Sequence, residues 1–282
     1  MGGAAPERKP KPATQFAFGE NWASYASLVD EDRLVEAERG LVRLLGPDAL
    51  RGRSILDIGC GSGLHAAAAG RLGAARIVAV DTDPRSVETA QALLRRHVPQ
   101  LAAAVRQASV FDLDTEPVGP FDVVYSWGVL HHTGAMRDGL RRAAEMVAPG
   151  GLFAFALYSR TRMCGLWRHE KRWYAAASPR AQRIARALYV ALLRVRFALT
   201  GRNFNAYVAN YKSARGMDFH HDVHDWMGGY PYESMTAEEV DGLMRTLEFA
   251  PVRSFTQPTS FGLFGSGCNE YVYRRPREAQ RE

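Results

Sequence analysis

The sequence of 282 residues contains little cysteine and no long apolar run. Its three cysteines, Cys60, Cys164 and Cys268, are an odd and widely spaced set, which argues against a disulfide framework or a zinc site and fits a reducing compartment. The longest apolar stretches, such as residues 152–158, are far shorter than the roughly 20 residues of a membrane span. No apolar run follows a basic start, as it would in a signal peptide. These absences predict a cytoplasmic protein without a transmembrane segment.

Acidic residues are scarce in one part of the chain. Between Arg160 and Arg215 stand thirteen lysines and arginines against one acid, Glu170, so this stretch carries +12 while the rest of the chain carries −6. Concentrated charge of one sign attracts partners of the opposite sign. The pattern predicts an anionic, amphipathic or surface-bound partner for this stretch.

The remaining sequence has the alternating strand and helix patterns of an α/β domain. Hydrophobic residues make up 46% of the chain, which is enough to bury a core. Short apolar runs alternate with helical patterns, and this alternation predicts a parallel sheet covered by helices on both faces. We expect strands at 54–58, 76–81, 103–109, 121–126, 152–158, 252–256 and 270–274, and helices at 16–45, 64–72, 84–96, 136–147 and 236–247.

This alternation of strand and helix patterns stops after Tyr158 and resumes about 75 residues later, at Thr236. Within the gap, Ser178 and Pro179 are typical of a helix start, and apolar residues from Ile184 to Leu199 then recur at helical spacing. We expect a lid helix packed on the domain; the alternative is a basic helix on a membrane surface. The expected organisation is a disordered tail (1–14), a core (15–158), a helical substrate-binding insertion (159–235), completion of the core sheet (236–274) and a tail (275–282).

A glycine-rich turn follows the first strand, at Gly59, Gly61 and Gly63. A backbone that passes close to a ligand cannot carry side chains there, and the helix after such a turn presents free N–H groups to the bound molecule. Asp57 precedes the turn. Asp81 ends the second strand, where a carboxylate can accept hydrogen bonds from ribose hydroxyls. The pattern therefore predicts a nucleoside-binding site.

The sequence resembles class I S-adenosylmethionine (SAM)-dependent methyltransferases at four places. These are residues 57–63, Asp81, residues 127–132 after strand four, and the turn at 149–151. The resemblance implies a Rossmann-like α/β fold, with a seven-stranded, mostly parallel sheet and a helical insertion after strand five. It also implies SAM as the cofactor, with Asp57 near its amino group and Asp81 at its ribose.

One position departs from this family pattern. Ser109 stands where the family often has an aspartate near the adenine, which leaves that contact to the backbone and to Val110 or Phe111. The residues expected around the cofactor are Trp22, Asp57, Gly59, Cys60, Gly61, Gly63, Asp81, Thr82, Ser109, Val110, Phe111 and Trp127.

The N-terminal segment 16–25 is similar to a bacterial small-molecule subgroup, loosely related to the quinone-biosynthesis methyltransferases, with an aromatic lid helix over the cofactor. Trp22 and Tyr25 either cap the sulfonium through cation–π attraction or simply pack this helix on the sheet. Both interpretations stay open at this point.

The insertion is expected to hold the acceptor, because ligands bind at the carboxyl ends of the strands in open α/β sheets. Its aromatic residues can form an apolar pocket, and its arginines can hold an anionic group. The resulting expectation is O- or C-methylation of a small molecule with an apolar body and an anionic or polar head, in secondary metabolism or glycan- or quinone-type biosynthesis. The substrate-binding residues expected are Tyr25, Trp167, Lys171, Tyr174, Tyr211, Arg215, Trp226, Tyr230 and Asn269.

The candidate catalytic residues are histidines and Glu170. His220 and His224 share a helix face, so one of them is a general base, or both bind a metal with Asp225, or the cluster is structural. Glu170, alone among many bases, is an ion-pair hub or a base facing the substrate. His131 follows strand four, where methyltransferases often contact the transferred methyl group. No metal is expected unless the substrate is a diphosphate.

Two other activities compete with this interpretation. A prenyl-diphosphate C-methyltransferase would use the basic insertion together with Mg²⁺. A nucleic-acid methyltransferase would suit the sequence pI of about 9.4, but Ser126–Val129 stands where such enzymes carry an Asn/Asp-Pro-Pro-Tyr-type motif. We therefore expect no nucleic-acid partner, and we keep peripheral membrane contact as an open alternative.

Overall fold

A computed structural model describes residues 18–26, 28–101, 103–113, 119–211, 218–258 and 260–277. The tail expected at 1–14 and most of that expected at 275–282 lie outside the described residues. In chain order the elements, with η for 3₁₀ turns, are α1 (Phe18–Ala26), α2 (Glu31–Leu45), β1 (Ser54–Ile58), α3 (Leu64–Arg71), β2 (Arg76–Asp81), α4 (Pro84–His97), β3 (Ala103–Gln107), η1 (Val110–Asp112), β4 (Phe121–Trp127), η2 (Leu130–His132), α6 (Met136–Glu145), β5 (Val147–Tyr158), α7 (Cys164–Ala176), α8 (Pro179–Leu199), α9 (Phe204–Ala209), α11 (Phe219–Gly228), α12 (Ala237–Thr246), β6 (Ala250–Phe255) and β7 (Cys268–Arg274).

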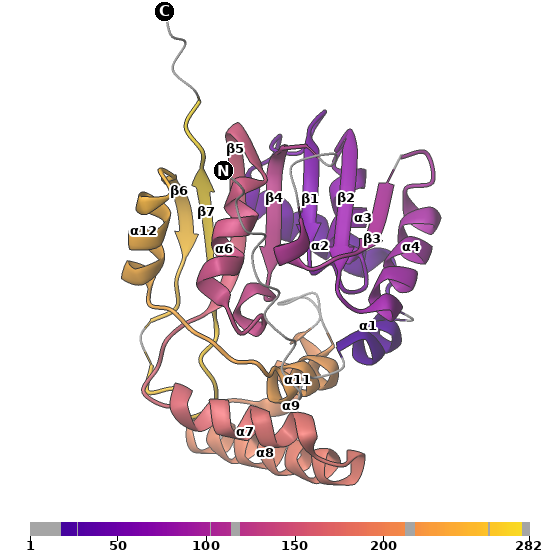
Figure 1. Ribbon diagram of the computed structural model, residues 1–282. Coiled ribbons are helices and arrows are strands. Elements are labelled where there is room, and N and C mark those ends of the chain that lie inside the picture. The colour runs from indigo at the N-terminus through magenta and orange to yellow at the C-terminus, as the bar shows by residue number, and fades with distance from the viewer. Residues whose placement is uncertain are drawn as a thin grey trace, which may run out of the picture.

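The strands form one seven-stranded sheet in the order β3-β2-β1-β4-β5-β7-β6 (Figure 1). The first five strands are parallel, and β7 runs antiparallel to both β5 and β6. In register, Ile55 faces Ile77 of β2 and Val123 of β4. The expected Rossmann-like fold with a mostly parallel sheet is confirmed.

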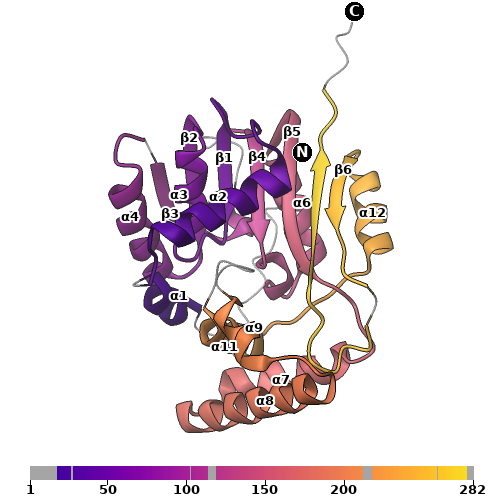
Figure 2. The same cartoon turned by 180° about the vertical axis from the view of Figure 1, so that it is seen from behind.

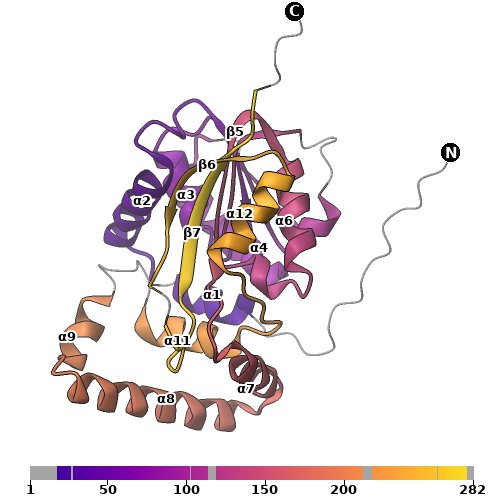
Figure 3. The same ribbon diagram turned by 90° about the vertical axis from the view of Figure 1, so that its left-hand side faces the viewer.

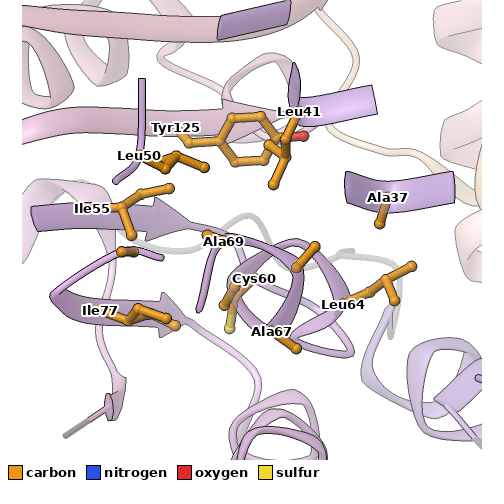
Figure 4. Packing of buried hydrophobic residues seen from close by; sticks show 14 of the residues in the cluster. Ala37, Leu41, Leu50, Ile55, Cys60, Leu64, Ala67, Ala69, Ile77 and Tyr125 are labelled. Atoms are coloured by element: carbon orange, nitrogen blue, oxygen red, sulfur yellow. The ribbon is translucent and has the colours of Figure 1, made fainter. Parts of the chain in front are cut away.

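Helices cover both faces of this sheet, with α2 and α3 on one face and α6 and α12 on the other (Figure 3). Helix α4 packs in the same layer as α2 and α3. Ile55 packs into the first layer and Leu56 into the second, because successive strand residues point to opposite faces. Figure 4 shows the first layer, where Leu41 of α2 and Ala67 of α3 surround Ile55. Burial on both faces explains why these strands read as continuous apolar runs.

Two predicted boundaries were wrong. The helix expected over 16–45 is divided into α1 and α2, because Asp30 caps a new helix and its side chain accepts a hydrogen bond from the backbone N–H of Arg33. The fifth strand begins at Val147 instead of Leu152, since the Pro149–Gly151 segment is part of β5. Local glycine and proline signals suggested a turn that pairing with the neighbouring strands overrides.

The insertion forms a separate layer beyond the carboxyl ends of the parallel strands, built from α7, α8, α9 and α11 (Figures 1 and 2). Helix α8 begins where predicted, with Ser178 as its N-cap and Pro179 in its first turn. The predicted packing was wrong, however. The apolar row from Ile184 to Leu199 faces outward, and α8 packs inward through Leu193 and Phe197. In the described part of the chain, no helix is both long enough and apolar enough to cross a membrane.

Candidate functional site

A cavity of about 3210 Å³ lies between the carboxyl ends of the strands and the insertion. Its lining comes from the glycine-rich turn, from the segments after β2, β3 and β4, from α1 and α2, from α8, α9 and α11, and from residues 257–258 and 260–267 before β7. Pockets for a single drug-sized ligand measure about 300–1,000 Å³. This cavity therefore has room for a cofactor and an acceptor together.

The glycine-rich turn forms one wall of the cavity. Gly59 (φ +75°) and Gly61 (φ +53°) adopt left-handed conformations that side chains disfavour. A Cβ on Gly59 would lie 2.4 Å from the side chain of Val129, and a Cβ on Gly61 would lie 3.0 Å from the indole of Trp22. The turn therefore brings bare backbone to the cavity, as the sequence predicted.

Two carboxyl groups stand beside this turn. Asp81 accepts hydrogen bonds from the backbone N–H of Gly61 (3.0 Å) and of Asp83 (2.9 Å), and burial raises its pKa. Asp57 is buried in the lining, and its Oδ2 has no hydrogen-bond partner among the described residues. Burial, and then the charge of Asp81, raise the pKa of Asp57 to about 7. A buried acceptor without a donor fits a cationic group of a ligand, such as an ammonium.

Helix α1 covers the turn as a lid. The backbone N–H of Gly19 donates to Asp83 Oδ2 (3.2 Å), and Asn21 Nδ2 donates to Asp225 Oδ1 of α11 (2.7 Å). Trp22 lies over Gly61, while Tyr25 is almost fully buried and meets Trp22 edge-on with 5.7 Å between ring centroids. Both rings also line the cavity. The geometry thus combines packing of the lid with contact to a ligand.

After β3, Ser109 caps η1 and its Oγ accepts the N–H of Phe111 (3.3 Å). Its side chain is therefore engaged locally, while Val110 and Phe111 border the cavity with it. Of the twelve residues expected around the cofactor, eleven line the cavity; the exception is Gly63, whose missing side chain allows the backbone of Ala90 to approach.

The residues expected to bind substrate divide into two groups. Tyr25, Tyr211, Trp226 and Tyr230 line the cavity. Trp167, Lys171, Tyr174 and Asn269 are buried outside the lining, and Arg215 lies outside the described residues.

Lys171 is fully buried behind Trp226. Its Nζ donates to the Trp226 carbonyl oxygen and lies 3.4 Å from the centroid of that indole, and burial lowers its pKa. The neighbouring Glu170 has two buried carboxylate oxygens without a hydrogen-bond partner among the described residues, and burial raises its pKa. Neither side chain borders the cavity, so both support the wall from behind.

Asn269 and Glu270 illustrate how strand alternation separates neighbours. Asn269 points into the protein, where its Oδ1 accepts the N–H of Gln257 (2.9 Å). Glu270 points to the cavity, accepts the indole N–H of Trp127 (2.8 Å) and pairs with Arg43 (2.5 Å). The sequence prediction named Asn269 and missed Glu270. Successive strand residues point to opposite faces, and only the pairing with β5 shows which of the two faces the cavity.

The histidines of the 220–225 cluster do not line the cavity, although Asp222, Val223 and Asp225 of the same helix do. His220 is exposed, and His224 Nδ1 is within hydrogen-bond distance of Tyr174 Oη (2.7 Å) and Arg186 Nη1 (2.9 Å). Burial, and then the charge of Arg186, lower the pKa of His224 to about 4. Asp225 faces Asn21 instead of the histidines, and the described residues contain no group of three or more His, Cys, Asp or Glu that could hold a metal ion.

His131 and His132 border the cavity after β4. His131 Nδ1 accepts the backbone N–H of Tyr158 (3.2 Å), so its neutral ring carries hydrogen on Nε2 and can only donate there. His132 has the opposite tautomer: its Nδ1 lies 2.8 Å from the Pro231 carbonyl oxygen and donates to it, so Nε2 carries a lone pair on the side of the ring that lies against Gly229. Burial lowers the pKa of His132 to about 4, so this ring is neutral at pH 7.

Comparison with known proteins agrees with this geometry. A family described as a methyltransferase domain matches residues 29–199. The ubiquinone biosynthesis O-methyltransferase of Methylocella silvestris is 33% identical over 191 residues, which cover 62% of this chain and 71% of that protein. The chain belongs to the class I SAM-dependent methyltransferases. The protein of the same description from Caulobacter sp. (strain K31) is 36% identical over 118 residues, 41% of this chain and 45% of that protein, so the match spans less than half of that relative.

A solved structure of similar fold is the N-methyltransferase NodS from Bradyrhizobium japonicum in complex with S-adenosyl-L-homocysteine. The TM-score is 0.52 with 16% sequence identity, over 92% of this chain and 99% of that chain. At this identity the likeness concerns the fold alone. The fold, the cofactor and the enzyme class predicted for this methyltransferase are confirmed, whereas its site residues stay predictions.

Binding of S-adenosylhomocysteine to the methyltransferase is expected to release protons near pH 7. Asp57, with a pKa of about 7, is partly protonated there, and an ammonium group beside it favours the ionised form. Calorimetry in two buffers of different ionisation enthalpy measures the release, which should fade at about pH 8.5 because Asp57 is then already ionised. An unchanged release in Asp57→Asn would contradict this assignment.

Proposed function

We propose that this methyltransferase transfers the methyl group of SAM to a small molecule with an apolar body and an anionic or polar head, in secondary metabolism or glycan- or quinone-type biosynthesis. The observation that carries the proposal is a single cavity shared by the glycine-rich turn, an aromatic wall and, among its arginines, two that form no ion pair with a described carboxylate. The description of both relatives above as O-methyltransferases of ubiquinone biosynthesis supports a hydroxyl acceptor.

The aromatic wall comes from the insertion. Its side chains pack on one another and present ring faces and edges to the cavity, so they suit a flat or extended apolar body. The residues of this wall are Tyr189, Phe197, Tyr207, Tyr211, Phe219 and Trp226.

Arg196 and Arg202 supply the positive charge. The guanidinium of Arg196 lies 4.9 Å from the centroid of Phe264, and that of Arg202 lies 5.0 Å from the centroid of Phe197. Both border the cavity, and within the described residues neither is paired with a carboxylate. Stacking on a ring orients a guanidinium while leaving its N–H groups for a carboxylate or phosphate.

The cofactor would be held at the opposite end. Asp57 would accept its ammonium, Asp81 its ribose hydroxyls, and Val110 and Phe111 would border its adenine. Bound SAM supplies an electrophilic methyl group. The chain itself excludes water, through the lid helix α1, and orients the acceptor for in-line attack.

A hydroxyl acceptor must lose a proton as the methyl group arrives, and His132 is the group that we assign to receive it. Its Nε2 carries a lone pair, its tautomer is held by the Pro231 carbonyl, and it borders the cavity. His131 has a hydrogen on Nε2, and this atom is buried without a hydrogen-bond partner among the described residues, so we assign His131 no direct role in proton transfer. This assignment differs from the sequence prediction, which named His131 and not His132.

The proposal is tested with pairs of alkyl-substituted catechols that differ only in a free carboxylate or its methyl ester. We expect kcat/KM to favour the acids by at least about tenfold, since a charged hydrogen bond contributes about 1.5–3 kcal/mol. Arg196→Gln/Arg202→Gln should abolish this preference, mainly through KM, whereas Arg95→Gln on exposed α4 should not. Equal use of acids and esters by the wild type would contradict an anionic head.

A further inference from the structure

Large apolar side chains are exposed at the end of the molecule farthest from the sheet. They come from α7, α8 and the loop before β7, and each of these residues is 53–83% exposed. Helices α7 and α8 form the outermost layer there (Figures 1 and 3). We call this surface the apolar face; its residues are Leu166, Trp173, Ile184, Leu188, Leu192, Val195, Leu199, Phe261 and Leu263.

The arrangement on α8 follows from helix geometry. At about 100° per residue, the five apolar-face residues between Ile184 and Leu199 fall within about 80° of one another. The buried Leu193 and Phe197 lie on the opposite side of the helix. The helix is thus apolar on two sides, and only one of them is covered by the protein.

Positive charge surrounds the apolar face. Arg180, Arg183 and Arg194 are exposed along one flank of the α8 row and Arg196 lies on the other. Glu170, the only acid between Arg160 and Arg215, keeps its carboxylate oxygens buried and offers no compensating charge at the surface. An apolar centre with a basic rim is the pattern of helices that lie in the interface of an anionic membrane.

The same pattern fits other partners less well. Nucleic acid would gain from the arginines but would leave the aliphatic row exposed to water. A second copy of the chain would bring two basic rims together, and like charges repel. A lipid bilayer with anionic headgroups satisfies both parts of the surface.

The apolar face also adjoins the cavity. Phe261 and Leu263 belong to the face and to the cavity lining, and the inner side of α8 lines the cavity through Leu193 and Phe197. A methyl acceptor with an apolar body partitions into a bilayer and could pass over this edge into the cavity. This last step rests on the proposed function, whereas membrane attachment does not.

We propose that the apolar face docks the methyltransferase on the surface of anionic membranes, with α8 lying in the lipid interface beside the cavity mouth.

Co-sedimentation of the full chain with vesicles tests the proposal. We expect at least about tenfold tighter binding to phosphatidylcholine vesicles containing about 30% phosphatidylglycerol than to phosphatidylcholine alone, because each arginine near the membrane surface is attracted to the anionic headgroups. Leu188→Gln/Leu192→Gln/Val195→Gln should weaken binding at least about tenfold. Val252→Gln, an exposed apolar residue on β6, is the matched control and should bind like the wild type.

A second variant keeps the test decisive if the first folds poorly, which calorimetry with S-adenosylhomocysteine reveals. Arg180→Gln/Arg183→Gln/Arg194→Gln should lose the preference for anionic vesicles. The proposal is overturned if the wild type does not bind anionic vesicles more tightly, if neither variant differs from it, or if light scattering finds a dimer that the apolar variant dissociates. None of these measurements uses methyl transfer, so their failure and the failure of the proposed function are distinguishable.

Discussion

Replacement of His132 by glutamine is expected to lower kcat by about 10²- to 10⁴-fold, the range contributed by a general base. In the neutral ring of His132, Nε2 carries a lone pair because Nδ1 donates to the Pro231 carbonyl oxygen, whereas a glutamine side chain is not basic. Single-turnover methyl transfer to the preferred catechol measures the effect. The affinity for S-adenosylhomocysteine should be nearly unchanged.

The pH dependence provides a second check on His132. Because burial lowers its pKa to about 4, the ring is neutral from physiological pH down to about pH 5. With SAM saturating, so that Asp57 stays ionised, the kcat/KM of the wild type for the acceptor should therefore stay level across this range, apart from groups of the acceptor, and fall as the pH drops through about 4. His169→Gln, an exposed histidine on α7, should have wild-type activity. A wild-type kcat in the His132→Gln variant would contradict the assignment of His132 as the general base.

The replacement Asp81→Ala is expected to weaken binding of S-adenosylhomocysteine by about 10- to 150-fold. This range corresponds to the roughly 1.5–3 kcal/mol of hydrogen bonds to a charged group. Two effects combine: the ribose hydroxyls lose their acceptor, and the backbone N–H groups of Gly61 and Asp83 lose theirs, which loosens the glycine-rich turn.

Isothermal titration calorimetry measures the effect of Asp81→Ala directly, without an acceptor. Asp81→Asn should fall between the wild type and the alanine variant, because its amide still has one acceptor oxygen but no charge. Asp48→Ala, at an exposed aspartate far from the cavity, is the matched control. A change of less than about threefold in Asp81→Ala would show that the ribose is bound elsewhere.

The site was predictable from sequence where the requirement is local. The positive φ angles of Gly59 and Gly61 exclude most side chains, and Asp57 and Asp81 end strands whose apolar runs are unmistakable. The acceptor side was less predictable, because its residues come from segments distant in the chain. Arg196, Arg202 and His132 carried no local signal that separated them from neighbouring arginines and histidines.

The apolar row of α8 shows the same limit most clearly. Its spacing correctly predicts a helix and one apolar side. We took that side to be packed on the domain, and the structure turns it outward, because Leu193, Phe197 and the aromatic rings of α9 and α11 cover the other side instead. Periodicity describes a face of a helix but not what covers it.

The amino-acid sequence by itself determined the sheet, the glycine-rich turn, the carboxylates beside it and hence the cofactor, since these depend on backbone conformation and on alternation within single strands. Only the tertiary structure decided which insertion side chains reach the cavity, which ring nitrogen of each histidine carries the hydrogen, and which side of α8 faces solvent. Each of these depends on a contact between distant segments, such as His132 with Pro231 or Asn21 with Asp225, and no local pattern encodes such a contact.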